Sequence, residues 1–198
     1  MLDKTLPRKN VPPFDAKAEN PRVHLLIFVH RIKELEPGMY FFLRAETDLA
    51  KIRSRTAGHL LWQQVTADFP LYLLQKGDVT ETAISLSCDQ AIAGDSAFSL
   101  GMLAEFRSIV EKEPFRYRDL FRECGMIGQV LYLEAEAYGF RGTGIGCFFD
   151  DPVHELLGLR DNSFQSLYHF TVGKAIEDKR LSTLLPYEHI KSRFQTAQ

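Results

Sequence analysis

Apolar residues run without interruption through two short stretches near the start of the chain. The first is VHLLIFVH, from Val23 to His30, and the second is GMYFFLR, from Gly38 to Arg44. Short continuous runs that are rich in β-branched and aromatic residues favour buried strands. The turn signal LEPG separates the two stretches, so the pattern predicts a β-hairpin.

Four further segments follow the hairpin. ETDLAKIRSR predicts a short surface helix capped by Thr47 or Asp48, and FPLYLLQKGD predicts a strand that ends in a glycine turn. DVTETAISLSCDQ predicts a helix that Asp78 opens and that ends near residues 88–90. SAFSLGMLAEF is apolar between polar borders, which predicts a central strand.

The clearest predicted element is a long helix. Apolar residues recur three and four positions apart at Leu120, Cys124, Ile127, Val130 or Leu131, Ala135 and Tyr138. This spacing predicts a helix from Leu120 to Tyr138 that is buried along one face and stopped by Gly139. Gly125 and Gly128 would permit the close approach of another backbone or of a flat ligand.

Three glycines at alternate positions mark RGTGIGCFFDD, from Arg141 to Asp151. A dinucleotide-binding turn needs a strand before it and a helix after it, whereas this stretch follows the long helix. We expect a glycine turn, then a strand over IGCFF, then a helix capped by Asp150 or Asp151. The glycines serve either a tight turn or a backbone that lies flat against a planar group.

The N-terminal residues 1–20 differ from the rest. They contain Pro7, Pro12 and Pro13, and their apolar residues show no period, which predicts an extended arm that packs on another part or is mobile. Residues 21–198 are then expected to form one domain.

The composition is that of an ordinary globular protein, with 45% apolar, 12% aromatic and 25% charged residues among 198. The formal net charge of −2 gives no global attraction to nucleic acid or to an anionic membrane. The sequence has no apolar run of about 20 residues and no apolar core of a secretory signal near its start. We therefore expect a cytoplasmic protein with a local binding site.

Residues that often carry chemistry are sparse. Cys88, Cys124 and Cys147 are widely spaced and form no CxxC pair, so we interpret them as buried packing residues rather than as a disulfide framework or zinc site. His24 and His30 are interpreted as strand-end residues rather than metal ligands. The sequence contains neither GxSxG nor HExxH, and we assign no metal site and no catalytic acid or base.

Longer segments carry a resemblance to a known family. They are YRDLFRECGMIGQVLYLEAEAYGFRGTGIGCFFDDPVHELLGL and SLYHFTVGKAIEDKR, with PGMYFFLRAETDLAKI and LLQKGDVTETAISLSCDQ upstream. The chain resembles the FMN-dependent nitroreductase superfamily and, more narrowly, its SagB-type dehydrogenases, over about residues 21–187. The resemblance implies an α+β sandwich with a central, mostly antiparallel sheet and a long buried helix. It also implies that two subunits interlock as a homodimer with FMN at their interface.

The resemblance also implies a function and a site. The function is that of an oxidoreductase that passes hydride or electrons through FMN, with NAD(P)H or a substrate as the donor. By position, the backbone of Gly144, Gly146 and Cys147 would lie beside the flavin ring. Gln90 would place its carboxamide at the pyrimidine edge of the flavin; the alternative on the residues alone is a capping or surface glutamine.

Phosphate binding is the part of this pattern that the sequence matches least. Lys179 and Arg180 fall where the family's basic residues reach the FMN phosphate, although they also fit a solvated surface cluster. The family's N-terminal helices carry an arginine-rich RRSxR-like motif, to which LPRKNVPP is not equivalent. The chain is therefore either an FMN-dependent oxidoreductase or a flavin-free interaction or scaffold module, or it is the C-terminal part of a longer protein.

Overall fold

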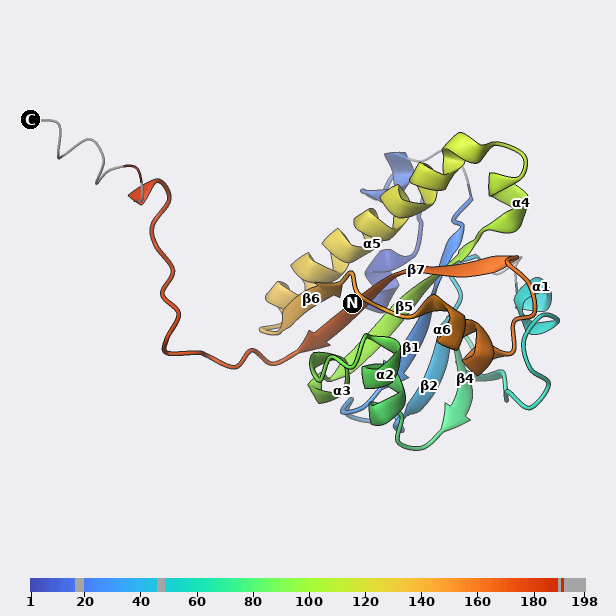
Figure 1. Cartoon of the computed structure of the whole chain (residues 1–198), viewed down its shortest axis with the longest axis horizontal. Coiled ribbons are helices and arrows are strands. Elements are labelled where there is room, and N and C mark those ends of the chain that lie inside the picture. The colour runs from blue at the N-terminus through green and yellow to red at the C-terminus, as the bar shows by residue number, and fades with distance from the viewer. Residues whose placement is uncertain (17–19, 46–48, 189, 191–198) are drawn as a thin grey trace, which may run out of the picture.

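The computed structural model describes residues 1–16, 20–45, 49–188 and 190, and in them seven strands form one antiparallel sheet in the order β3-β4-β2-β1-β5-β7-β6 (Figure 1). The strands are β1 Val23–Val29, β2 Gly38–Phe42, β3 Gln63–Thr66, β4 Phe69–Lys76, β5 Phe98–Glu105, β6 Arg141–Ile145 and β7 Phe164–Gly173. The α-helices are α1 Leu49–Arg53, α2 Thr80–Leu86, α3 Ile92–Asp95, α4 Arg107–Val110, α5 Tyr117–Ala137 and α6 Asp150–Leu157. Short 3-10 turns are η1 Leu2–Thr5, η2 Phe14–Ala16 and η4 Pro114–Arg116. The expected α+β class is confirmed.

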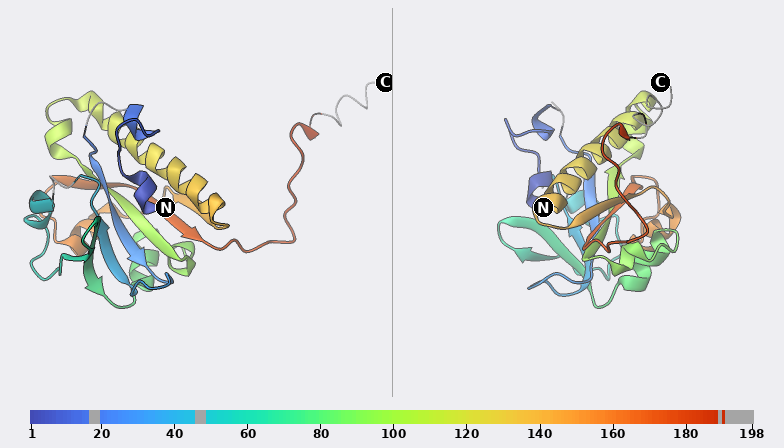
Figure 2. Two further views of the ribbon diagram at one scale, coloured as in Figure 1. Left: turned by 180° about the vertical axis from the view of Figure 1, so that it is seen from behind. Right: turned by 90° about the vertical axis from the view of Figure 1, so that its left-hand side faces the viewer.

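Helices cover both faces of the sheet. The long α5 crosses one face, and α2, α3 and α6 lie on the other (Figure 2). In β1, alternate residues from Val23 to Val29 pack in the core under α5, while Leu26 and Phe28 pack in the opposite core. Successive side chains of a strand point to opposite faces, so a strand covered on both sides favours a continuous apolar run.

The predicted hairpin and central strand are confirmed. β1 pairs with β2 in antiparallel register from Leu25↔Phe42 to Val29↔Gly38. β5 lies between β1 and β7, and all eight of its residues are buried. Asp78 accepts the backbone N–H of Thr80 at 2.9 Å just before α2, but the N-cap position is Val79, one residue after the expected one. The caps proposed for α1, at positions 47 and 48, lie outside the described residues.

The buried face of α5 is the one that the sequence predicts. Its buried apolar residues are Leu120, Cys124, Ile127, Leu131 and Ala135. The expectation for Tyr138 was wrong, because this residue follows the end of the helix and is 63% exposed. The described helices include none that is both long and apolar enough to cross a membrane.

The glycine stretch required a correction. The strand β6 is Arg141–Ile145 itself, and residues 146–149 are irregular, so the glycine turn followed by a strand over IGCFF was wrong. β6 is one of the two edge strands of the described sheet, and its neighbour there is β7. A Cβ at Gly142 would lie 2.7 Å from the Phe170 ring, so glycine here makes room for an aromatic ring of the neighbouring strand.

A buried ion pair joins the end of β2 to α5. The Arg44 and Glu123 side chains are 0% and 1% exposed, and Nη1 lies 2.5 Å from Oε1. Glu123 also accepts the backbone N–H groups of Arg22 and Val23, at 3.1 and 3.3 Å. Burial lowers the pKa of Arg44 despite the attraction of Glu123, which shows how strongly desolvation opposes this pair.

The N-terminal arm packs on the same pair. Arg44 donates from Nε to the carbonyl of Thr5 at 2.8 Å, and its guanidinium lies 4.7 Å from the centre of the Phe14 ring. Leu2 and Leu6 pack against the core under α5. Figure 2 shows this segment beside the helix. Of the two alternatives for the arm, packing therefore applies to residues 1–16.

Replacing Glu123 with glutamine should lower the free energy of unfolding by about 3–5 kcal/mol, because the Arg44 charge then stays buried without its partner. Urea denaturation measures the loss. The matched control is Glu136→Gln on the same helix, where Glu136 pairs with Arg141 and both side chains are 56% exposed; its loss should stay under about 1 kcal/mol. Equal losses in the two variants would show that the buried pair contributes no more to the free energy of unfolding than the exposed pair does.

Candidate functional site

The end of α2 and the loop after β6 meet at two hydrogen bonds. Gln90 donates from Nε2 to the Cys147 carbonyl at 3.1 Å and to the Ser87 carbonyl at 2.7 Å. The backbone N–H of Phe149 donates to the Leu86 carbonyl at 2.9 Å. The structure therefore brings Gln90 together with Cys147, two of the predicted site residues that are 57 positions apart in sequence.

A disulfide joins the same two segments. Cys88 and Cys147 are bonded, with Cα atoms 5.8 Å apart. Cys147 is exposed and Cys88 is half-buried, so the interpretation of these two cysteines as buried packing residues was wrong, while Cys124 is buried as expected and lies outside the disulfide. The turn after α2 brings Cys88 into place, since Cys88 and Asp89 both adopt left-handed conformations with φ of 54° and 56°.

The two glycines predicted for the site have different surroundings. The backbone N–H of Gly144 donates to the Tyr132 hydroxyl at 2.7 Å, and a Cβ at Gly144 would lie 2.2 Å from the Tyr168 hydroxyl oxygen. Both the amide and the side-chain direction of Gly144 are thus occupied within the chain. A Cβ at Gly146 would meet nothing within 4 Å, so the open part of this backbone begins at Gly146.

His169 on β7 lies beneath this loop. Its ring stacks on Phe148 at 4.5 Å between centroids, with 13° between the planes. Its Nδ1 is 3.3 Å from the Ser87 hydroxyl, and its Nε2 is 3.1 Å from the Ser166 hydroxyl. A Cβ at Gly101 on β5 would lie 3.1 Å from Nε2, so that glycine makes room for the ring. Burial lowers the pKa of His169 to about 4, and the imidazole is neutral at pH 7.

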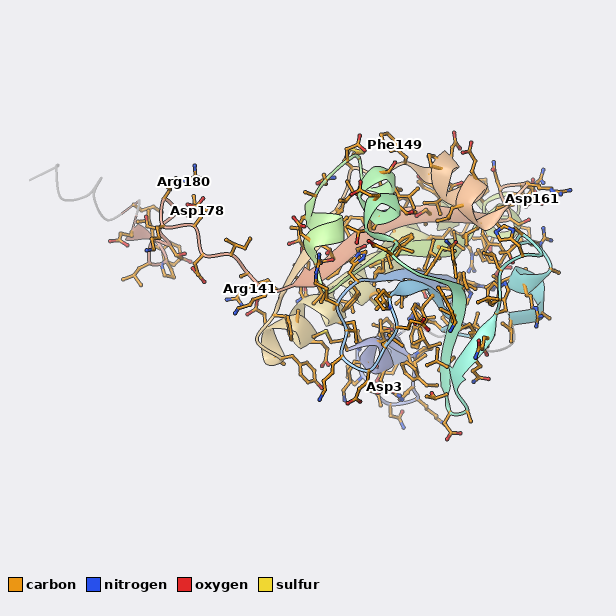
Figure 3. The ribbon with its side chains drawn as sticks, turned by 90° about the horizontal axis from the view of Figure 1, so that it is seen from below. Asp3, Arg141, Phe149, Asp161, Asp178 and Arg180 are labelled. Atoms are coloured by element: carbon orange, nitrogen blue, oxygen red, sulfur yellow. A yellow bond between two sulfur atoms is a disulfide. The ribbon has the colours of Figure 1, made fainter. Side chains whose placement is uncertain are left out.

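The predicted phosphate ligands do not join this cluster. Lys179 and Arg180 belong to the segment after β7, which runs away from the sheet (Figure 3). The Arg180 guanidinium binds the Asp178 carboxylate at 2.6 Å, and this hydrogen bond lowers the pKa of Asp178. Within one chain, the segment that carries these cations therefore extends away from the sheet (Figure 3).

Sequence reasoning missed several residues that build the site. They are Ser87, Tyr132, Phe148, Ser166, Tyr168 and His169. His169 carried a signal, because it is a lone imidazole in the apolar run SLYHFTVG. The contacts of Ser87 and Tyr132 join elements far apart in sequence, and no local pattern indicates them.

Comparison with known proteins identifies the family. The model of the nitroreductase family matches residues 40–174. This match covers more than half of the chain, and the chain belongs to the nitroreductase family. No curated protein sequence matches it.

Three solved structures share the fold. A protein from Anabaena variabilis described as a nitroreductase has a TM-score of 0.65 at 23% identity, over 88% of this chain and 32% of that one. One from Ralstonia eutropha, described in the same way, has a TM-score of 0.53 at 14% identity over 80% and 60%. A chain of the E. coli microcin synthetase McbBCD complex has a TM-score of 0.57 at 17% identity over 89% and 62%. The chain thus spans 32–62% of the length of these proteins.

The buried His169 should make stability fall with acid. The folded state holds its pKa at about 4 and the unfolded state at about 6.5, so this contribution is complete above pH 6.5 and is lost as the pH falls to 4. The loss amounts to about 3 kcal/mol. Urea denaturation at stepped pH measures it. The variant His169→Gln should lack this part of the slope, and identical slopes in both proteins would contradict the prediction.

Proposed function

We propose that the chain is an FMN-dependent oxidoreductase of the SagB-type dehydrogenase-like group that acts as a cytoplasmic homodimer on a small-molecule or peptide substrate. Bound FMN would accept and release an electron pair as a hydride equivalent, with NAD(P)H or a substrate as the donor. The chain's own residues hold and orient the ring, and no side chain is assigned as an acid or base.

The observation that carries this proposal is the open backbone at Gly146, next to Cys147, whose carbonyl accepts a hydrogen bond from the Gln90 carboxamide. Glycine at 146 leaves the backbone accessible on the side where a Cβ would stand, which suits a flat ring. The Gln90 amide nitrogen is directed at two carbonyls, so its carbonyl oxygen is the atom available to accept an N–H of the flavin pyrimidine. Gly144 would have a supporting part, since Tyr132 and Tyr168 fix the strand that leads to this edge.

The phosphate is the part of FMN that one chain fits least. Lys179 and Arg180 belong to the C-terminal segment, and Figure 3 shows that this segment, with Arg180 labelled, runs away from the sheet. Our proposal therefore requires a second copy whose C-terminal segment supplies these cations. The outer face of α5 supports self-association, because a Cβ at Gly125 would meet nothing within 4 Å and Leu133 is 61% exposed.

A second candidate function is a flavin-free module that keeps the dimerising fold or completes a longer partner. The observation that favours it is length, since the chain spans 32–62% of the structures it resembles. Absorbance of the freshly purified protein in the flavin band distinguishes the two candidates, and it requires no knowledge of the substrate.

Replacing Gly146 with valine should lower FMN affinity by about tenfold or more, because a branched side chain then stands on the proposed ring face. Its urea unfolding curve should change little, since the position is open within the chain. Gly144→Val is the matched control: it collides with Tyr168 and should lose about 1–3 kcal/mol of stability. Flavin fluorescence titration and urea denaturation give both readouts.

Two outcomes of this titration would count against the proposal. Unchanged FMN affinity in Gly146→Val would refute the proposal that the flavin ring lies against the backbone at Gly146. The absence of FMN binding by the unsubstituted protein would favour the flavin-free module instead.

The chain should also be a dimer by light scattering at micromolar concentration, and it should bind FMN more tightly than riboflavin, which lacks the phosphate. At the exposed cations Lys179 and Arg180 we expect a preference of roughly threefold at low salt that shrinks as salt rises. Reversing both charges with Lys179→Glu and Arg180→Glu should abolish this preference. A monomer, or equal affinity for the two flavins at low salt, would refute the assignment of the two cations.

A further inference from the structure

We infer that Cys88 and Cys147 are a thiol-exchange site, at which a low-molecular-weight thiol attacks Cys147 and displaces Cys88. The exchange uses two sulfurs of this chain and needs no cofactor. The inference therefore stands independently of FMN binding. Its substrate class is a small aliphatic thiol in one direction and the corresponding disulfide in the other.

Contacts on both sides of the disulfide hold the two segments together without it. The Phe149 N–H donates to the Leu86 carbonyl at 2.9 Å on one side. On the other side, Gln90 donates to the carbonyl of Cys147 itself at 3.1 Å. These bonds do not involve sulfur, so they persist when the disulfide is reduced.

A third contact anchors the residue after Cys147. Phe148 stacks on the buried ring of His169 at 4.5 Å, and His169 belongs to the central part of the sheet through its pairing with Gly101. The two thiols of the reduced protein are thus kept near each other, and reclosure costs little loop entropy. These contacts favour a disulfide that opens and closes reversibly, because the loop stays in position when the two sulfurs are reduced.

The two sulfurs differ in access to solvent. Cys147 is exposed on the irregular loop after β6, whereas Cys88 is half-buried in the left-handed turn after α2. Exchange proceeds by attack of a thiolate on one sulfur, and access decides which sulfur is attacked. Cys147 is therefore the electrophilic sulfur and Cys88 the leaving thiolate, which then takes up a proton.

The reaction balances with two equivalents of the small thiol. The first forms a mixed disulfide with Cys147 and releases the Cys88 thiol. The second attacks the mixed disulfide, and the products are the protein dithiol and the small-molecule disulfide. The protein disulfide gains two electrons and two protons, which the two thiols lose. One consequence rests on the proposed function: the mixed disulfide places a substituent on the Cys147 side chain, beside the backbone proposed to face the flavin.

The test compares two variants, each of which lacks one cysteine of the pair and keeps the buried Cys124, by their reaction with an aromatic disulfide reagent that releases a coloured thiol. In Cys88→Ser the remaining Cys147 should react at least about tenfold faster than Cys88 does in Cys147→Ser, since attack follows exposure. Cys124→Ser, which removes the buried thiol outside the disulfide, is the matched control and should react with the reagent as the unsubstituted protein does. Circular dichroism checks that each variant is folded.

A second measurement uses the unsubstituted chain and needs no variant. The folded protein is treated with millimolar 2-mercaptoethanol, quenched with acid and analysed by peptide mass spectrometry. We expect the mixed disulfide on the Cys147 peptide and complete reclosure of the pair after the thiol is removed. An adduct on Cys88, reduction that requires denaturant, or a reduced pair that fails to reclose in the folded protein would each overturn the inference, whatever the FMN titration shows.

Discussion

The buried ion pair between Arg44 and Glu123 is the constraint that fixes the sheet, α5 and the N-terminal arm relative to one another. Moving two charges out of water costs several kcal/mol for each, and the chain offsets this cost with backbone groups. Glu123 takes the N–H groups of Arg22 and Val23 at the start of β1, while Arg44 takes the Thr5 carbonyl of the arm. Sheet, helix and arm therefore have to be in place together for the pair to be satisfied.

This pair also fixes where α5 lies along the sheet. Glu123 stands within the apolar face of the helix, between Leu120 and Ile127. A shift of one turn would leave Glu123 without Arg44 and place an ionised carboxylate against hydrocarbon, a state that proteins avoid. The apolar residues alone would tolerate neighbouring registers, because they repeat at helical spacing. Glu123, the charged residue within the apolar face of α5, thus selects one register of the helix on the sheet, which the apolar residues alone do not.

The position of α5 then determines the edge of the sheet where the candidate site lies. Tyr132, near the end of the helix, accepts the Gly144 N–H and packs edge-on against Phe170 at 4.8 Å. β6 follows α5 directly, so these contacts hold the strand against β7. The open backbone at Gly146 continues that strand. The ion pair thus determines its position indirectly, because it fixes α5 and α5 holds β6.

Local patterns in the sequence predicted the hairpin, the central strand and the buried face of α5, because each depends on residues close together in the chain, whereas the α+β class was implied by the family resemblance. The disulfide was missed since Cys88 and Cys147 are 59 positions apart. The status of the glycine stretch as a strand was missed because its partner is β7. For the candidate site, the resemblance named Gln90 and Cys147, which the fold brings together, but a family pattern says nothing of what else contacts them, such as Tyr168 over Gly144.

The loop at residues 146–149 has four attachments that act through different chemistry, and this determines how it responds to its surroundings. One is covalent, through Cys147, two are hydrogen bonds, and one is the stacking of Phe148 on neutral His169. Reduction removes only the first. Protonation of His169 weakens only the last, because a buried imidazolium would have to regain water. Since all four act on one short segment, the effects of losing them are not additive. The loop keeps its place when the disulfide or the stacking alone is lost. When the disulfide and the stacking are both lost, its position depends on the two hydrogen bonds.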